Sequence, residues 1–70
     1  MGGTFKFIRL VGTSEKNYED AIANALSDAR ASLRGLNWYQ VVEQRGAIDE
    51  GGKVSEYQIV LDVAFKIDRS

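Results

Sequence analysis

The 70-residue sequence contains no cysteine and no histidine. Disulfide bonds and thiolate metal sites are therefore excluded, and the commonest ligand of transition metals is missing. A chain of this size buries only a small core, and such chains usually need disulfides, a structural metal or oligomerisation to be stable. Because the sequence offers neither of the first two in their common forms, we expect the protein to assemble from several copies.

Long apolar runs are also missing, since no stretch approaches the ~20 residues that span a bilayer. The N-terminus lacks the basic and apolar segments of a secretory signal. Nine Lys and Arg stand against ten Asp and Glu, which gives a net charge of -1, whereas a nucleic-acid-binding protein normally carries a basic face. We therefore expect a cytoplasmic protein that binds neither membranes nor nucleic acids.

The first half of the chain predicts a strand followed by a helix. Residues 4–11 are rich in β-formers. From Tyr18 onward, apolar side chains recur every 3.6 residues, which predicts an amphipathic helix packed on one face. This apolar row consists of Tyr18, Ile22, Ala25, Leu26, Ala29, Leu33 and Leu36. Ser14 and Asn17 are alternative caps for the start of the helix, and Gly35 is expected to end it.

The second half predicts a hairpin. Residues 37–49 form the first of its strands, with Gly46 as a bulge or a point of close approach. Residues 53–68 alternate between apolar and mostly polar side chains, which indicates a strand with one buried face. The apolar row comprises Tyr57, Ile59, Leu61, Val63, Phe65 and Ile67. The fold class is α+β: a β-α-β-β chain of one domain, residues 1–70, whose three-stranded antiparallel sheet wraps around one helix.

The length of the last strand carries a further consequence. About fifteen residues span roughly 50 Å, whereas a compact 70-residue domain has a radius of gyration of only ~11 Å. The hairpin must therefore bend sharply or project beyond its own core. A projecting hairpin exposes strand edges and apolar side chains that other copies have to cover.

Four short motifs, in this order and spacing, resemble the dodecins, small flavin-binding proteins that assemble as hollow dodecamers. The motifs are Leu10–Ser14, Leu33-x-x-Leu36-Asn37-Trp38, Glu43-x-Arg45-Gly46 and Tyr57–Phe65. The resemblance covers nearly the whole chain. It implies non-catalytic binding, storage and sequestration of FMN, riboflavin or FAD at subunit interfaces of a homododecamer, with no catalytic residue and no metal ligand. Coenzyme A, which some bacterial relatives bind, is a further implied partner.

The resemblance also implies roles for single residues. Trp38 corresponds to the tryptophan that stacks on the flavin ring, and Gln58 to the glutamine that hydrogen-bonds the polar edge of the ring. Arg45 and Lys66 resemble basic residues that contact the flavin side chain or phosphate. Asn37 stands where flavin-binding members usually carry Asp, and many bacterial members carry Arg where Lys66 stands. Because Lys does not grip a phosphate bidentately as Arg does, FMN and riboflavin both remain open.

Taken without the resemblance, these residues have plainer interpretations. Trp38 is then a core or interface aromatic, and Gln58 a solvated amide. Arg45 is an exposed charge or the ion-pair partner of Glu43 or Glu56.

Two other functions of the protein also stand open. One is a flavin enzyme, against which the missing His and Cys argue, and the other is a flavin-free shell that binds calcium at the acidic turn 49–53.

The hairpin register predicts where Trp38 and Gln58 lie. With the turn centred on Gly51, Trp38 is expected opposite Ala64 and Gln58 opposite Gln44, unless a bulge intervenes. Trp38 and Gln58 then share the sheet face opposite the apolar row, about six residues or ~20 Å apart along the strand. A flavin ring system is shorter than this, so we expect one binding site to draw its residues from more than one copy.

Overall fold

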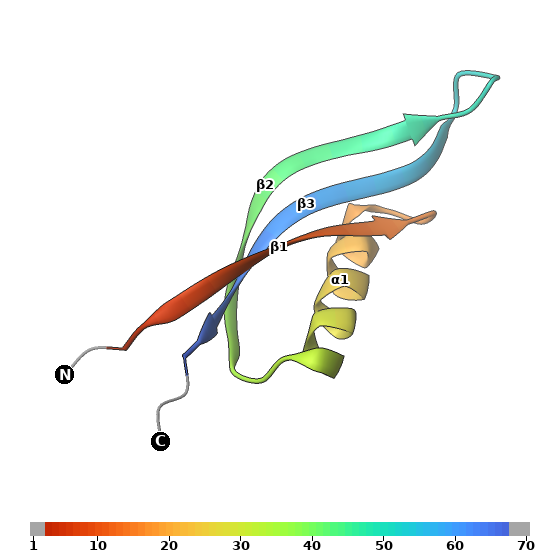
Figure 1. Ribbon diagram of the computed structural model, residues 1–70. Coiled ribbons are helices and arrows are strands. Elements are labelled where there is room, and N and C mark those ends of the chain that lie inside the picture. The colour runs from red at the N-terminus through yellow and green to blue at the C-terminus, as the bar shows by residue number, and fades with distance from the viewer. Residues whose placement is uncertain (1–2, 68–70) are drawn as a thin grey trace.

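A computed structural model describes residues 3–67 of the chain. Its elements are β1 (Phe5–Ser14), α1 (Tyr18–Ser32), β2 (Leu36–Ile48) and β3 (Val54–Lys66). The three strands form one antiparallel sheet in the order β1-β3-β2. As Figure 1 shows, α1 lies against one face of the sheet and the strands curve around it. The β-α-β-β order and the three-stranded antiparallel sheet around one helix are confirmed.

Of the two alternative caps, Asn17 is the one that starts α1. Its side-chain oxygen accepts a hydrogen bond from the backbone N–H of Asp20 at 2.7 Å, which satisfies one of the unpaired donors of the first turn. Ser14 is instead the last residue of β1, and its hydroxyl donates to the Asp20 carboxylate at 2.7 Å. Both side chains therefore fix the connection between β1 and α1.

The helix packs on the sheet through small side chains, because Ala21, Ala25 and Ala29 are its buried residues. This spacing of four keeps the contact on one side of the helix and lets the helix come close to the sheet. The apolar row predicted for the helix was too long at its C-terminal end, because it included Leu33 and Leu36. The helix ends at Ser32, and Leu33 takes an extended conformation. Gly35, three residues later, lies in the connection to β2 with φ of +73°.

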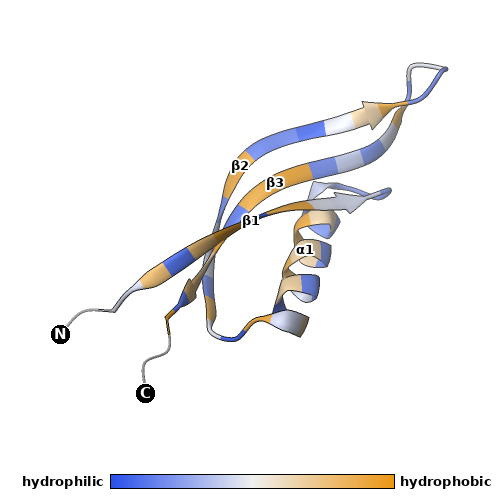
Figure 2. Ribbon diagram, viewed as in Figure 1, coloured by the Kyte–Doolittle hydropathy of each residue, from blue (hydrophilic) through white to orange (hydrophobic). Residues whose placement is uncertain are grey.

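The core lies between α1 and the central strand β3. Ile59, Leu61 and Val63 are fully buried, and they belong to the apolar row predicted from the alternation. Two residues of the opposite row, Val60 and Ala64, are buried as well. Figure 2 shows this apolar character in the middle of β3, while the tip of the hairpin is hydrophilic. Part of the helix-free face is therefore also covered.

A bulge in β2 changes the hairpin register. The pairing with β3 shifts by one residue between Val41 and Glu43, so that Val42 is the extra residue. Bulges bend a strand and increase its twist, and this one lies in the middle of the long hairpin. Gly46 is paired with Tyr57, so it is not the bulged residue. A side chain there would lie 2.8 Å from a backbone carbonyl oxygen of β3, so its role as a point of close approach is confirmed.

The bulge moves one of the two predicted pairs. Trp38 lies opposite Ala64, as the simple register predicts. Gln58 lies opposite Arg45, so the prediction that it faces Gln44 is wrong by one residue. Trp38 and Gln58 nevertheless remain on the same face, because Ala64 and Gln58 are six residues apart on β3 and side chains alternate with a period of two.

The molecule is elongated, as the strand lengths predict. Its principal extents are 55 × 20 × 14 Å and its radius of gyration is 14.5 Å, compared with ~11 Å for a compact chain of this length. The hairpin of β2 and β3 projects past the end of α1 (Figure 1). Several large apolar side chains are exposed along the strands, among them Phe7, Val11, Val42, Ile48 and Val54. No helix within residues 3–67 is long and apolar enough to cross a bilayer.

Candidate functional site

The five site residues predicted from the sequence fall into two groups at opposite ends of the hairpin. Trp38, Asn37 and Lys66 lie where β2 begins and β3 ends, and together with Phe5 and Phe7 of β1 they form what we call the Trp38 end. Arg45 and Gln58 lie nearer the hairpin tip, and together with Glu43 and Glu56 they form the Gln58 end.

At the Trp38 end, the indole ring packs against two phenylalanines of β1. Its centroid lies 4.8 Å from that of Phe5 with a tilt of 52°, and 6.2 Å from that of Phe7 in an edge-to-face arrangement. Trp38 lies opposite Ala64, which is fully buried, yet 45% of Trp38 itself remains exposed. The indole is thus held from the side by aromatic contacts and keeps surface for a further planar group.

The other two residues of this end are polar and exposed. Lys66 lies opposite Phe5 in the pairing with β1, and Asn37 sits at the irregular start of β2. Asn37 and Trp38 both line a shallow hollow of about 180 Å³ between β2 and α1. Neither Asn37 nor Lys66 forms a side-chain hydrogen bond with another of residues 3–67, so both side chains can contact a bound molecule.

At the Gln58 end, the side chains form a chain of hydrogen bonds. The Nε of Arg45 donates to Oε1 of Gln58 at 2.9 Å, and Nε2 of Gln58 donates to Oε1 of Glu56 at 2.7 Å. Arg45 also forms an ion pair with Glu43, with 3.0 Å between Nη1 and Oε1. Of the two carboxylates proposed as partners of Arg45, Glu43 is confirmed, and Glu56 instead holds the amide of Gln58.

The two ends are too far apart to meet on one small ring. Ala64, which lies opposite Trp38, and Gln58 are six residues apart on β3, a distance of ~20 Å along the strand. This is longer than a three-ring heterocycle. A single chain can therefore offer its indole or its amide to such a ring, and a ring that contacts both has to take them from two chains.

Between the two ends, Arg9 and Asp62 cross-link β1 to β3. Nε and Nη2 of Arg9 donate to the two carboxylate oxygens of Asp62 at 2.8 Å and 3.0 Å. These hydrogen bonds lower the pKa of Asp62 below its ordinary value and raise that of Arg9, because each charge is favoured by the other. The sequence interpretation missed this pair, as it did Phe5 and Phe7, because only the pairing of β1 with β3 brings them to this face.

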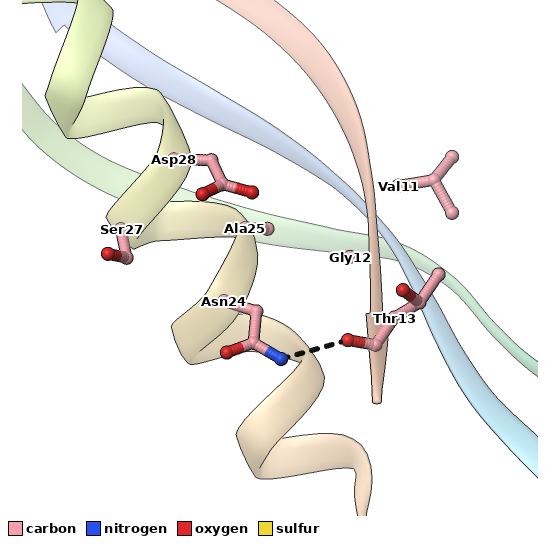
Figure 3. A pocket seen from close by; sticks show the side chains of 7 residues that line it. All are labelled: Val11, Gly12, Thr13, Asn24, Ala25, Ser27 and Asp28. Atoms are coloured by element: carbon pink, nitrogen blue, oxygen red, sulfur yellow. Dashed lines mark hydrogen bonds between the residues drawn. The ribbon is translucent and has the colours of Figure 1, made fainter. Parts of the chain in front are cut away.

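A separate hollow of about 320 Å³ lies between the end of β1 and the helix (Figure 3), and none of the five predicted residues lines it. Asn24 of α1 and Thr13 of β1 both line it and are joined by a hydrogen bond, with Nδ2 of Asn24 donating to the backbone oxygen of Thr13 at 3.0 Å. Asp28 is the one ionisable side chain in its lining. Among residues 3–67, no three His, Cys, Asp or Glu side chains gather as metal ligands would.

Known proteins resemble this chain in sequence and fold over nearly its whole length. The dodecin family model matches residues 4–68. The chain is 50% identical over 70 residues to the dodecin of Thermus thermophilus, which covers 100% of both chains. A crystal structure of a Thermus thermophilus protein, 49% identical, has a TM-score of 0.91 and covers 99% of this chain and 100% of its own.

Two further relatives widen the comparison. The dodecin from Streptomyces davaonensis is 32% identical, with a TM-score of 0.91 over 99% of this chain and 100% of its own. The calcium dodecin of Mycobacterium tuberculosis is 40% identical over 63 residues, which are 90% of this chain and 87% of the relative. With the family model matched from residue 4 to residue 68 and half of the residues shared with a dodecin of equal span, the chain belongs to the dodecin family.

Proposed function

We propose that this protein binds a flavin without transforming it, and stores it between copies of the chain in a dodecameric shell. FMN, riboflavin and FAD all contain the ring that such a site recognises. The observation that carries the proposal is the placement of Trp38, a half-exposed indole held in position by Phe5 and Phe7. Aromatic faces of this kind stack well on planar ligands.

The remaining residues fit the other parts of a flavin. The Gln58 amide offers a donor and an acceptor to the uracil-like edge of the ring. Lys66 and Arg45 are cations that suit a phosphate-bearing side chain, and Asn37 adds an amide beside the indole. Since the indole and the amide of one chain lie ~20 Å apart along the strand, the site is complete only between copies. The sequence holds no His or Cys to act on the ring or on a substrate beside it.

Assembly is part of the same proposal. The chain is elongated and exposes large apolar side chains along the two edge strands, β1 and β2, which favours burial against other copies. We expect the mass in solution, measured by light scattering at micromolar concentration, to correspond to twelve subunits. A monodisperse monomer would contradict the proposed shell.

The binding test is a titration of riboflavin with protein, followed by flavin fluorescence. Stacking on the electron-rich indole should quench the emission strongly, and Trp38→Ala should weaken binding by about 1–3 kcal/mol, the scale of base–aromatic stacking. The matched control is Tyr39→Leu. Tyr39 is as exposed as Trp38, at 45%, but lies on the opposite face of the sheet, across from Val63.

The outcomes separate cleanly. Quenching by the wild type and by Tyr39→Leu, with loss in Trp38→Ala, supports the stacking role. Equal affinity and equal quenching in Trp38→Ala would refute the stacking role of Trp38. No change in flavin fluorescence with the assembled wild-type protein would refute flavin binding altogether.

A flavin-free, calcium-binding shell is the alternative function, and the 40% identity to a calcium dodecin is the observation that favours it. The acidic turn adds no support, because Oδ1 of Asp49 accepts the backbone N–H groups of Gly51 and Lys53 at 2.9 Å and 3.0 Å, and within residues 3–67 no three acidic side chains gather there as metal ligands would. This alternative predicts a rise in melting temperature on adding calcium, lost on adding a chelator, and no effect of riboflavin on the same measurement.

A further inference from the structure

The amide of Gln58 is bonded at both of its polar atoms within the chain. Oε1 accepts from Arg45 on β2, and Nε2 donates to Glu56 on β3. A primary amide oxygen has two lone pairs and its nitrogen carries two hydrogens. Each atom therefore retains one further hydrogen bond, and the amide offers a ligand one acceptor and one donor side by side.

These two partners also fix which way the amide points. A rotation by 180° would place the amide NH₂ against the guanidinium N–H of Arg45, and the amide oxygen against the carboxylate of Glu56. Both contacts would then pair like with like, donor with donor and acceptor with acceptor. Arg45 has no acceptor, and an ionised Glu56 has no donor. The rotated amide therefore loses both hydrogen bonds, and one orientation is selected.

We propose that Arg45 and Glu56 are positioning residues, which hold the Gln58 amide ready for a ring edge that carries an N–H beside a carbonyl. The inference rests on the proposed flavin binding and deepens it. The selected ligand class is a planar heterocycle with a free imide edge, in which the ring N–H meets Oε1 and the ring carbonyl meets Nε2. A ring alkylated at that nitrogen loses the first of these contacts.

Positioning is distinct from a direct contact between Arg45 and the side chain of the flavin. A phosphate contact makes Arg45 important for FMN and unimportant for a ring that has no side chain. Positioning makes Arg45 important for the bare ring as well, because its effect passes through Gln58. A ligand without ribityl chain or phosphate therefore separates the two roles.

The experiment measures binding of lumichrome, the flavin ring without the ribityl chain, and of N3-methyl-lumichrome, to the assembled protein. The variants are Arg45→Met, Gln58→Ala and the double variant. Arg34→Met is the matched control, because Arg34 is exposed in the connection between α1 and β2 and forms no side-chain hydrogen bond with another of residues 3–67. It removes the same charge from another part of the chain.

We expect Arg45→Met to weaken lumichrome binding about 5- to 10-fold, the effect of losing one oriented hydrogen bond. Binding of the N3-methyl compound should change less than about 2-fold, since the oxygen of Gln58 has no ring N–H to accept. In the Gln58→Ala background, the Arg45 substitution should have no further effect, because two residues that act through one contact are not additive. Arg45→Lys, which keeps a charged donor, should restore part of the affinity.

A second measurement is made without ligand. In ¹H–¹⁵N spectra, the side-chain NH₂ signals of Gln58 should shift in Arg45→Met, because the amide loses one of its two partners, and stay unchanged in Arg34→Met. If Arg45→Met does not fold, Glu56→Ala tests the other partner. Glu56 holds Nε2, which meets the ring carbonyl that both compounds carry, so binding of both should weaken, and unchanged lumichrome affinity in this variant overturns the positioning role.

Unchanged lumichrome affinity and unchanged Gln58 signals in a folded variant overturn the positioning role and leave flavin binding intact. An equal loss for lumichrome and for its N3-methyl derivative in Arg45→Met also overturns it. Absence of lumichrome and riboflavin binding in the wild type overturns both the positioning role and the proposed function.

Discussion

The Trp38 end and the Gln58 end occupy the same face of one hairpin and use different forces. At the Trp38 end, three aromatic rings pack together and leave half of the indole exposed, so contacts there are broad and weakly directional. At the Gln58 end, hydrogen bonds of 2.7–3.0 Å link four polar side chains in a fixed order. One end suits the face of a planar ligand and the other suits its polar edge.

The distance between the ends explains why the proposed site needs more than one chain. The centre of the face is taken up by the Arg9–Asp62 pair and by the buried Val60, and it carries neither the indole of Trp38 nor the amide of Gln58. The hairpin thus carries two half-sites. Under the proposed function, a ligand that requires both types of contact binds where the Trp38 end of one chain meets the Gln58 end of another, so that binding should depend on assembly.

The largest expected effect comes from the scaffold that both ends share. A side chain at Gly12 would collide with the carbonyl oxygen of Ala21 and lie 2.8 Å from the side chain of Ala25. Because the helix backbone cannot give way as a flexible side chain can, Gly12→Ala should destabilise the fold by about 1–3 kcal/mol or more. Thermal unfolding followed by circular dichroism measures this change.

Gly51→Ala is the control for that substitution, since a side chain there meets only the carboxylate of Asp49, at 3.4 Å. Both ends should lose ligand contacts together in Gly12→Ala as the fold weakens. A variant at Gly12 as stable as the wild type would show that β1 and α1 are not held as closely as the structure indicates.

The fold was predictable because its main signals are periodic. Alternation in β3 identified Ile59, Leu61 and Val63 as the core, and the 3.6-residue period identified the helix. The burial of Val60 and Ala64 was not predictable from their own strand. It depends on residues of the neighbouring strands, Phe7 and Trp38 opposite Ala64 and Val11 opposite Val60, which come together only through the pairing of three strands.

The site was predictable in its members and only partly in its geometry. Trp38 was placed correctly opposite Ala64, and the separation of the two ends followed from strand length. The partner of Gln58 was wrong by one residue because the bulge falls at Val42, within an ordinary β-forming run and without the glycine that often marks such a position. The hydrogen bond between Arg45 and Gln58 is a consequence of that shift.

A smaller effect is expected from the cation at the Trp38 end. Lys66 lies exposed across from Phe5 and forms no side-chain hydrogen bond with another of residues 3–67. If it meets the flavin phosphate, Lys66→Met should weaken FMN binding about 2- to 5-fold, as for an exposed ion pair, and leave riboflavin binding unchanged. The test is the difference between the affinities for FMN and riboflavin, measured by titration at low salt. Equal losses for both ligands would show that Lys66 supports the structure of the Trp38 end and does not contact the phosphate.

The smallest expected effect is the pH dependence carried by the pair between the ends. Arg9 lowers the pKa of Asp62 in the folded chain, so the stabilisation is complete above the unfolded pKa of about 3.9 and is lost as pH falls through the folded value. Below about pH 4, the melting temperature of the wild type should therefore fall more steeply than that of Asp62→Asn. Parallel curves for the two proteins would show that the pair contributes nothing to stability.

The central claim is that one binding site takes its indole and its amide from different chains. Trp38→Ala and Gln58→Ala subunits, each a poor binder alone, are mixed by co-refolding, and riboflavin binding to the mixed shells is measured. If two chains share each site, tight binding should return in a fraction of the sites, where an intact Trp38 meets an intact Gln58. Well-formed mixed shells that bind no more tightly than either parent would contradict the account.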